Sequence, residues 1–299
     1  MRGSGVAREG AIANPLANDA AGKETLERSG LVPQRGGAFP GPQRSKNRSR
    51  IKAVLLVGGL GTRLRSAITG LPKSLARVGN RSLLELLVGQ LRCYGIRRLV
   101  MCTGYLGEQI EKQFGDGRSW DVEIEYSREF LPLGTAGAVK LAGQYLREVS
   151  DFVVMNGDSF LETNFHRLIR FHRRHAGLVS IATLQVQDAS RYGTVRVDAG
   201  GRVLSFSEKT GRKFAGLVSG GVYVFSCPVL EHIPQGPASL EKDVFPNLLN
   251  HGVYALEQRG MFIDIGTPED YARAQTICDD LYDAACHSHG PRRCPRKHC

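Results

Sequence analysis

The chain lacks the sequence features that mark membrane-spanning and secreted proteins. No apolar run approaches the ~20 residues that span a bilayer, and no apolar core follows the basic N-terminus, which argues against a secretory signal. The seven cysteines are an odd number and show no paired metal spacing in the body of the chain. This pattern is typical of reduced thiols. We therefore expect a cytoplasmic protein without membrane insertion.

The basic charge is concentrated at the two ends of the chain. Residues 1–50 hold nine Lys/Arg and four Asp/Glu, a charge of +5, and residues 287–299 hold four Lys/Arg and no acids, a charge of +4. The net charge of +11 therefore leaves only +2 for residues 51–286. No nucleic-acid partner is expected for this central part. Nucleic-acid binding through the two ends is an alternative, and it would show a steeply salt-dependent affinity.

Composition divides the chain into three parts. Residues 1–50 are rich in Gly, Ala, Arg, Pro and Asn without a sustained period, and we expect a disordered basic extension there. Residues 51–286 are predicted to form one large α/β domain, because a 41% hydrophobic chain of this length can build a sizeable core. Residues 287–299 are predicted to be a basic tail.

Strands and helices alternate in the first half of the predicted domain. Apolar segments of strand length occur at 53–57, 97–103, 122–126 and 151–156, and helical patterns occur at 83–95, 106–114 and 138–146. Ser82 is the expected N-cap of the first of these helices. This rhythm predicts βαβ units and a doubly wound, mostly parallel, Rossmann-like sheet. We assign residues 51–177 to a nucleotide-binding part.

Short β-rich segments replace this alternation from residue 178 onward. They lie at 178–186, 193–198, 202–206 and 217–225, and they predict a small β-rich part with mixed or antiparallel strands. Ser239 is expected to cap a helix reaching Leu249, and Thr267, followed by Pro268, one reaching about Ala285. Residues 178–286 thus form the second part of the domain.

The most informative stretch is residues 51–75, IKAVLLVGGLGTRLRSAITGLPKSL. A strand leads into Gly58-Gly59-Leu60-Gly61, a turn in which backbone N–H groups can approach a ligand. Thr62, Arg63 and Lys73 follow. A strand, a glycine turn and two cations in this order predict a site for several phosphates. A tight turn with scattered surface cations is the structural alternative.

Two common phosphate-binding motifs do not fit this stretch. A P-loop requires Lys-Ser/Thr directly after its last glycine, whereas Gly61 is followed by Thr62 and Arg63. A dinucleotide-binding fingerprint requires a third glycine at the position of Leu64. Other glycine-loop families must therefore be considered.

Two aspartates follow predicted strands elsewhere in the chain. Asp158 lies in Asn156-Gly157-Asp158 at the end of strand 151–156, and Asp264 ends the apolar segment Phe262–Asp264. The carboxyl ends of parallel strands are where ligands bind in open α/β sheets, and two carboxylates can hold Mg²⁺ against phosphates. Spacing alone does not bring them together, and Asp158 could instead be a loop residue or a helix cap.

The stretch GGLGTRLR…LPKSL resembles the signature of the sugar-phosphate nucleotidyltransferases, GGxGTRLxPLT…PKPLxPV. Ser74 and Arg77 stand where that family usually has prolines. Further matches, covering 52–275 in all, are LGTAG at 133–137, Glu208-Lys209, SGGVY at 219–223 and EKD at 241–243. Ser219 replaces the usual asparagine, which puts one sugar hydrogen bond in doubt.

The resemblance implies a role for each matched residue. Arg63 and Lys73 are the implied catalytic residues. Nucleotide-binding positions are Gly58, Gly59, Gly61, Thr62, Arg63, Glu129, Gly134 and Thr135. Sugar-phosphate-binding positions are Asn156, Glu208, Lys209, Gly221 and Glu241. Asp158 and Asp264 are implied to share Mg²⁺, with Mn²⁺ as a second option. Glu129 is a candidate for reading the two donors of guanine, with a solvated loop glutamate as the alternative.

The implied reaction transfers a nucleoside monophosphate from a triphosphate to a sugar 1-phosphate. Within the family the resemblance favours GTP and D-glycero-α-D-manno-heptose 1-phosphate, for capsule or surface glycan synthesis. Mannose 1-phosphate with GTP, or a hexose or muramate 1-phosphate with UTP or dTTP, are alternatives. A catalytically inactive regulatory subunit with this fold is a further alternative, and homodimerisation is left open.

Overall fold

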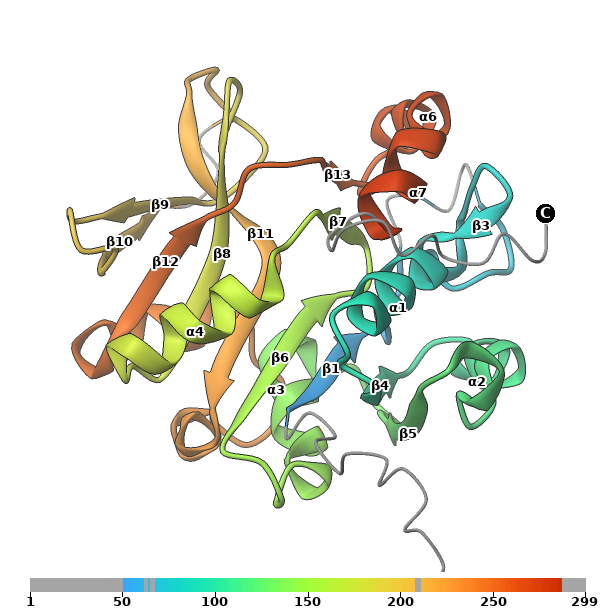
Figure 1. Ribbon diagram of the computed structural model, residues 1–299, viewed down its shortest axis with the longest axis horizontal. Coiled ribbons are helices and arrows are strands. Elements are labelled where there is room, and N and C mark those ends of the chain that lie inside the picture. The colour runs from blue at the N-terminus through green and yellow to red at the C-terminus, as the bar shows by residue number, and fades with distance from the viewer. Residues whose placement is uncertain (1–50, 62–63, 65–67, 208–210, 287–299) are drawn as a thin grey trace, which may run out of the picture. The chain divides into compact units, whose positions relative to one another are not determined.

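The computed structural model describes residues 51–61, 64, 68–207 and 211–286. Within them, nine strands form one mixed sheet with helices on both faces (Figure 1). Its main path runs β10-β9-β11-β6-β1-β4-β5, and β8 and β12 join through β11. The parallel centre consists of β1 (Lys52–Leu56), β4 (Arg98–Thr103), β5 (Glu123–Arg128) and β6 (Asp151–Asn156). The predicted α/β class is confirmed.

The central strands are apolar on both sides because both faces of the sheet are covered. Val54 belongs to the core on one face, together with the alanines of α3 (Gly134–Ala142). Its neighbours Ala53 and Leu55 belong to the core on the other face, together with the leucines of α1 (Leu83–Cys93). Alternate residues of one strand thus serve opposite layers.

Helix α3 begins four residues earlier than the sequence predicts. The expected start was Ala138, after a glycine turn, but the helix already includes Gly134. Gly134 has a φ of +69°, and a Cβ there would lie 2.5 Å from the carbonyl oxygen of Ala238. Gly134 therefore allows the first turn of α3 to approach Ala238, which is distant in sequence.

The three predicted N-caps are confirmed. The hydroxyls of Ser82, Ser239 and Thr267 each accept a hydrogen bond from the backbone N–H three residues later. After Ser239, however, the chain first forms a π-helical turn, η6 (Leu240–Val244), before α5 (Phe245–Leu248). π-Helical turns often occur at functional sites.

The antiparallel part of the sheet is organised around β11 (Gly216–Ser226), which pairs with β6 on one side and β8 (Val179–Val186) on the other. The register shifts between Ser219 and Val222, where Gly221 has a φ of +73°. A bulge at this point re-aims the side chains that follow it. The remaining strands are β9 (Thr194–Val197), β10 (Val203–Ser207) and β12 (Val253–Glu257).

Two small antiparallel ribbons lie outside the main sheet. β7 (Ser159–Leu161) pairs with β13 (Phe262–Asp264), and β2 (Arg77–Val78) pairs with β3 (Arg81–Ser82) as a hairpin. The last predicted helix is interrupted at Ile277, which gives α6 (Pro268–Thr276) and α7 (Cys278–Cys286).

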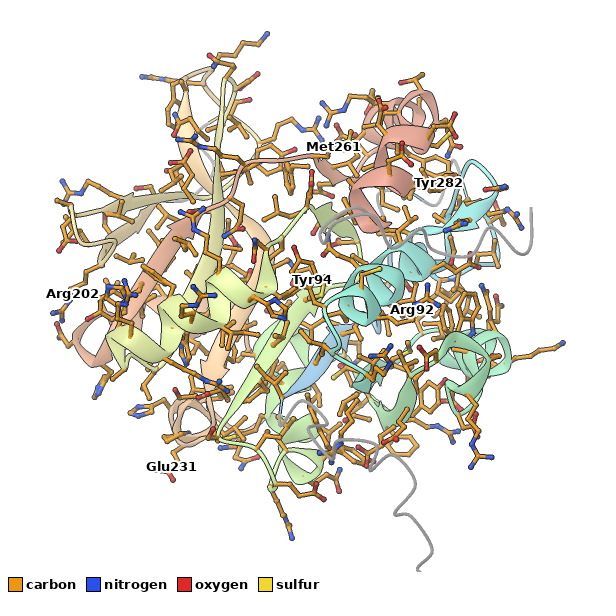
Figure 2. The ribbon with its side chains drawn as sticks, viewed as in Figure 1. Arg92, Tyr94, Arg202, Glu231, Met261 and Tyr282 are labelled. Atoms are coloured by element: carbon orange, nitrogen blue, oxygen red, sulfur yellow. The ribbon has the colours of Figure 1, made fainter. Side chains whose placement is uncertain are left out.

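Helices α6 and α7 hold the β2–β3 hairpin in place. The Tyr282 hydroxyl donates to the carbonyl of Val78 and accepts hydrogen bonds from the backbone N–H groups of Asn80 and Arg81 (Figure 2). The Gln275 amide makes two further hydrogen bonds to the backbone of the same hairpin. The hairpin, which lies just after Lys73, is thus fastened to the last described helices.

The other helices are α2 (Gly107–Phe114) and α4 (Phe165–His175). α4 occupies a segment without a predicted element and packs against β8, β11 and β12 (Figure 1). No helix in the described part of the chain is long and apolar enough to span a bilayer.

Candidate active site

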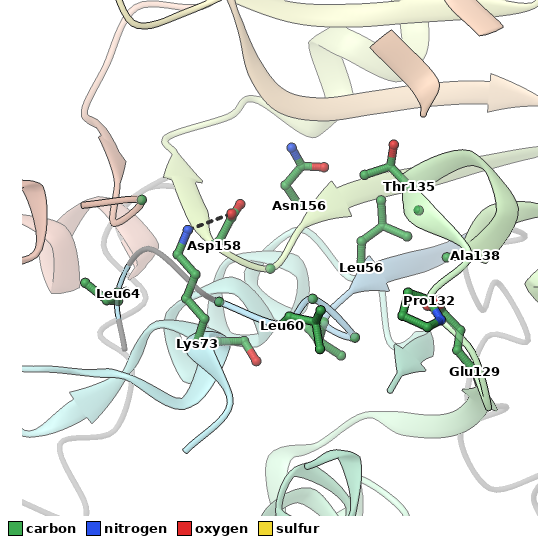
Figure 3. Close-up of a pocket in the computed structure, with 18 residues that line it drawn as sticks. Leu56, Leu60, Leu64, Lys73, Glu129, Pro132, Thr135, Ala138, Asn156 and Asp158 are labelled. Atoms are coloured by element: carbon green, nitrogen blue, oxygen red, sulfur yellow. Dashed lines mark hydrogen bonds and ion pairs between the residues drawn. The ribbon is translucent and has the colours of Figure 1, made fainter. Parts of the chain in front are cut away.

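Two cavities open where the parallel strands end. The first, about 420 Å³, is lined by the glycine loop, Lys73, Glu129 and the start of α3 (Figure 3). The second, about 470 Å³, is lined by β9 to β11, η6 and β13. Asn156 and Asp158 line both cavities, so two bound molecules would meet there.

The glycines after β1 serve different purposes. A Cβ on Gly58 would lie 2.9 Å from Glu129 Oε1, and Gly61 has a φ of +57° with its missing Cβ facing Lys73. A Cβ on Gly59 would meet nothing within 4 Å, so packing does not require that glycine. Gly59 lines the first cavity and leaves room for a ligand. Thr62 and Arg63 lie outside the described residues.

Lys73 and the two predicted metal ligands form one charged cluster. The Lys73 Nζ atom lies 2.7 Å from Asp158 Oδ2 (Figure 3) and 3.9 Å from Asp264 Oδ1. The side chain of Lys73 is only 11% exposed. Pairing of β13 with β7 places Asp264 opposite Ser159, next to Asp158. This short ribbon brings the two aspartates together, which their separation in the sequence could not predict.

The carboxyl of Asp264 is suited to bind a cation. Its burial and the neighbouring Asp158 raise the pKa of Asp264, and Lys73 opposes this increase. The Oδ1 atom is buried and accepts no hydrogen bond from the described residues. A buried acceptor beside a second carboxylate fits Mg²⁺, which prefers oxygen ligands and keeps several positions for phosphates and water. Among the described residues, no group of three or more His, Cys, Asp or Glu side chains could hold a metal ion.

The predicted nucleotide-binding residues beyond the glycine loop also line the first cavity. Glu129 follows β5, and its Oε2 atom accepts the Leu133 N–H at 2.9 Å. Burial raises the pKa of the Glu129 carboxyl. Gly134 and Thr135, in the first turn of α3, form the adjacent wall.

Three predicted sugar-phosphate-binding residues, Asn156, Gly221 and Glu241, line the second cavity. A Cβ on Gly221 would lie 2.7 Å from Ser159 Oγ, so a side chain there would displace the cavity wall. The buried Asn156 Oδ1 accepts no hydrogen bond from the described residues. Glu208 and Lys209 lie outside the described part of the chain.

Most of the aromatic lining of the second cavity was not predicted from the sequence. The rings belong to Tyr192, Phe206, Tyr223, Phe245 and Phe262. Tyr223 ends the matched segment SGGVY at 219–223, although no role was assigned to it there. The others come from separate elements, and no local pattern marks them as neighbours.

A protein family, curated proteins and solved structures all match this chain over most of its length. A family described as "Nucleotidyl transferase" matches residues 52–280. The mannose-1-phosphate guanylyltransferase catalytic subunit beta of Xenopus tropicalis is 35% identical over 225 residues, which is 74% of this chain and 62% of that protein. The mannose-1-phosphate guanylyltransferase of Mycobacterium tuberculosis is 35% identical over 229 residues, 75% of this chain and 63% of that protein. The chain thus spans less than two thirds of these curated relatives.

Solved structures share the fold. HddC from Yersinia pseudotuberculosis, complexed with GMP-PN, has a TM-score of 0.69 and 31% identity, covering 76% of this chain and 99% of that chain. A putative glucose-1-phosphate thymidylyltransferase from Bacillus anthracis has a TM-score of 0.69 and 22% identity, covering 77% and 96%. The second likeness concerns the fold alone.

Proposed function

The chain belongs to the nucleotidyl transferase family, as its motifs predicted, and we propose that it transfers a nucleoside monophosphate from a triphosphate to a sugar 1-phosphate. The observation that carries this proposal is the meeting of two cavities at Asn156 and Asp158, beside Lys73. A nucleotide in the glycine-lined cavity and a sugar phosphate in the aromatic-lined cavity would have their phosphates at this junction.

The reaction requires two anions to be held together and aligned. An oxygen of the sugar phosphate bonds to the α-phosphorus, and the bond from that phosphorus to the oxygen bridging the β-phosphate breaks, which releases pyrophosphate. No covalent intermediate with the protein is needed. Lys73 lines the first cavity and is the proposed donor to the α-phosphoryl oxygens as their charge grows. Arg63 and Lys209 are proposed to bind the triphosphate and the sugar phosphate.

Asp158 and Asp264 are the proposed ligands of Mg²⁺, with Mn²⁺ as a substitute. A bound Mg²⁺ would neutralise phosphate oxygens and stabilise the departing pyrophosphate. The ammonium of Lys73 supplies one positive charge for two carboxylates, so the cluster itself leaves a negative charge that a divalent cation can match.

GTP is the proposed donor, and D-glycero-α-D-manno-heptose 1-phosphate is the proposed acceptor, for capsule or surface glycan synthesis in the cytoplasm. The guanylyltransferase relatives and the GMP-PN complex of HddC support a guanine nucleotide. The same relatives, named for mannose 1-phosphate, favour that sugar as the second candidate. Glu129 is the proposed acceptor for the guanine N1–H and N2 amino donors.

A substrate panel read by pyrophosphate release tests this proposal. GTP, ATP, UTP and dTTP are each combined with heptose, mannose and glucose 1-phosphates. We expect the fastest release with GTP and a manno-configured sugar. A preference for UTP or dTTP would overturn the guanylyl assignment, and no release from any pair would overturn the reaction class.

A further inference from the structure

A chain of hydrogen bonds joins the walls of the two cavities at Glu241. On the nucleotide side, Thr135 Oγ1 lies 3.3 Å from Glu241 Oε2. On the sugar side, the Tyr223 hydroxyl lies 2.9 Å from Glu241 Oε1, and Ser219 Oγ lies 3.2 Å from that hydroxyl. Thr135 lines the first cavity, whereas the other three line the second.

The hydrogen bonds of this network can be donated in only one direction. A carboxylate only accepts, so the hydroxyls of Thr135 and Tyr223 must both donate to Glu241. Thr135 Oγ1 also accepts the Leu240 N–H at 2.8 Å. With its proton committed, the Tyr223 hydroxyl accepts from Ser219, and Ser219 accepts the Gly221 N–H at 3.3 Å.

Ser219 therefore has a defined use at the position where the resemblance leads us to expect asparagine. Its only proton is donated to Tyr223. The side chain supports the cavity wall and has no donor left for a sugar hydroxyl. Glu241 accepts a third hydrogen bond, because the Ser239 hydroxyl lies 3.1 Å from its Oε2 atom.

Backbone hydrogen bonds strengthen the same connection. The Ala136 N–H donates to the carbonyl of Ala238, and the Ala238 N–H donates to the carbonyl of Leu133, both at 2.9 Å. The segment that begins η6 is therefore fastened to the first turn of α3. Side chains on one wall of the sugar cavity, Glu241 among them, depend on how this turn is positioned.

We propose that Glu241 is a positioning residue that couples the two cavities, so that a nucleotide beside Thr135 orders the wall that receives the sugar phosphate. This inference rests on the proposed function, because it requires a different substrate in each cavity. Coupling between two binding sites is reciprocal. A bound sugar phosphate must therefore tighten nucleotide binding by the same factor.

Thr135→Val tests the coupling, because valine keeps the shape of threonine and removes its hydroxyl. The KM for mannose 1-phosphate at saturating GTP should rise about three- to tenfold, the scale of one lost hydrogen bond, although residue 135 lies on the nucleotide wall. Thr135→Ser should restore the KM toward its original value. Tyr223→Phe should raise the same KM, whereas Tyr254→Phe, at a residue that lines neither cavity, should not.

The double variant Thr135→Val/Tyr223→Phe should show less than the product of the two single effects, because both hydroxyls act through Glu241. Thermal unfolding of each variant checks that the fold is retained. A rise in the KM for GTP alone, or fully multiplicative effects in the double variant, would overturn the coupling.

Calorimetry separates this inference from the proposed function. Mannose 1-phosphate is titrated into the protein with and without a GTP analogue whose α,β bridge cannot be cleaved. We expect the analogue to tighten sugar-phosphate binding at least about fivefold, near the lower end of measured couplings, and Thr135→Val to reduce this factor. Equal affinities with and without the analogue would overturn the coupling. Normal coupling without turnover would instead contradict the reaction class.

Discussion

Lys73 links the two carboxylates to the space where the α-phosphate is proposed to lie. Lys73→Ala is expected to lower kcat by about a hundred- to a thousandfold, the scale for removing one electrostatic donor from a transition state, with a smaller change in KM. Steady-state kinetics with GTP and mannose 1-phosphate measure both constants. Lys112→Ala, which removes an exposed lysine on α2, is the control. A change confined to KM would show that Lys73 contributes only to ground-state binding.

Asp158 and Asp264 lead to a metal-dependence prediction. Asp158→Asn and Asp264→Asn should each reduce turnover to near background while the protein stays folded, because asparagine supplies no negative charge to a cation. Circular dichroism and a Mg²⁺ titration of activity test this, with the exposed Asp121→Asn as the control. Full wild-type activity in excess chelator would contradict the assignment.

Glu129 leads to a prediction about base selection. Glu129→Gln should lower kcat/KM for GTP far more than for UTP or ATP, because a site built around paired polar groups penalises their loss by several kcal/mol. Glu108→Gln, at an exposed position on α2, should change none of these values. Equal losses across all triphosphates would exclude Glu129 from base selection.

Helix α4 carries a buried histidine that sets an acid limit on stability. His172 lies between the hydroxyls of Ser180 and Ser226, at 3.0 and 2.9 Å. Burial lowers the pKa of His172, with Asp151 opposing this shift and Arg173 adding to it. Below about pH 6.5, the ordinary histidine pKa, His172 is protonated in the unfolded chain but stays neutral in the folded chain. The free energy of unfolding should therefore fall as the pH decreases, until the pH passes the folded pKa.

Urea unfolding between pH 5 and 8 measures this dependence. His172 should contribute a slope of at most about 1.4 kcal/mol per pH unit. His172→Gln, which cannot titrate, should flatten the curve, whereas the exposed His251→Gln should not. Identical curves for His172→Gln and the wild type would contradict the prediction.

The elements differ in how far the sequence could predict them. Ser82 and Thr267 were predictable as caps because a hydroxyl before a helical pattern has a specific bonding partner. The early start of α3 was hidden because Gly134 is required by contact with Ala238, which is distant in sequence. The β7–β13 ribbon has three-residue strands, too short for a periodic signal, yet it brings Asp264 to Asp158.

The family motifs named residues that line both cavities, among them Lys73, Asp158 and Asp264. The resemblance implied that Asp158 and Asp264 lie near each other, and the structure places both carboxylates within 4 Å of the Lys73 Nζ atom. The connection from Thr135 to Tyr223 could not be predicted, because it depends on how a π-helical turn packs against another element. Hydrogen bonds of this kind are set by tertiary packing and leave no pattern within either segment.

The whole molecule has an uneven charge distribution that is independent of the candidate site. Every described site residue lies between Leu56 and Gly266, while the two ends, 1–50 and 287–299, carry +9 of the +11 net charge. Removing both ends is expected to leave kcat and KM within about twofold. Pyrophosphate release by the shortened and full chains measures this. A large loss would assign the ends a direct part in catalysis.

The fastening of the β2–β3 hairpin by Tyr282 has a consequence for the growing polypeptide during translation. A nascent chain that has left the ribosome as far as Gly266 already contains every described residue of the candidate site. It still lacks Gln275 and Tyr282, which hold the hairpin beyond Lys73. We expect Lys73 to be poorly positioned in such a chain. The proposed activity should therefore arise only when α6 and α7 have emerged. A stop codon just before α7 should therefore lower the proposed turnover, measured by pyrophosphate release, as much as the loss of Lys73 itself.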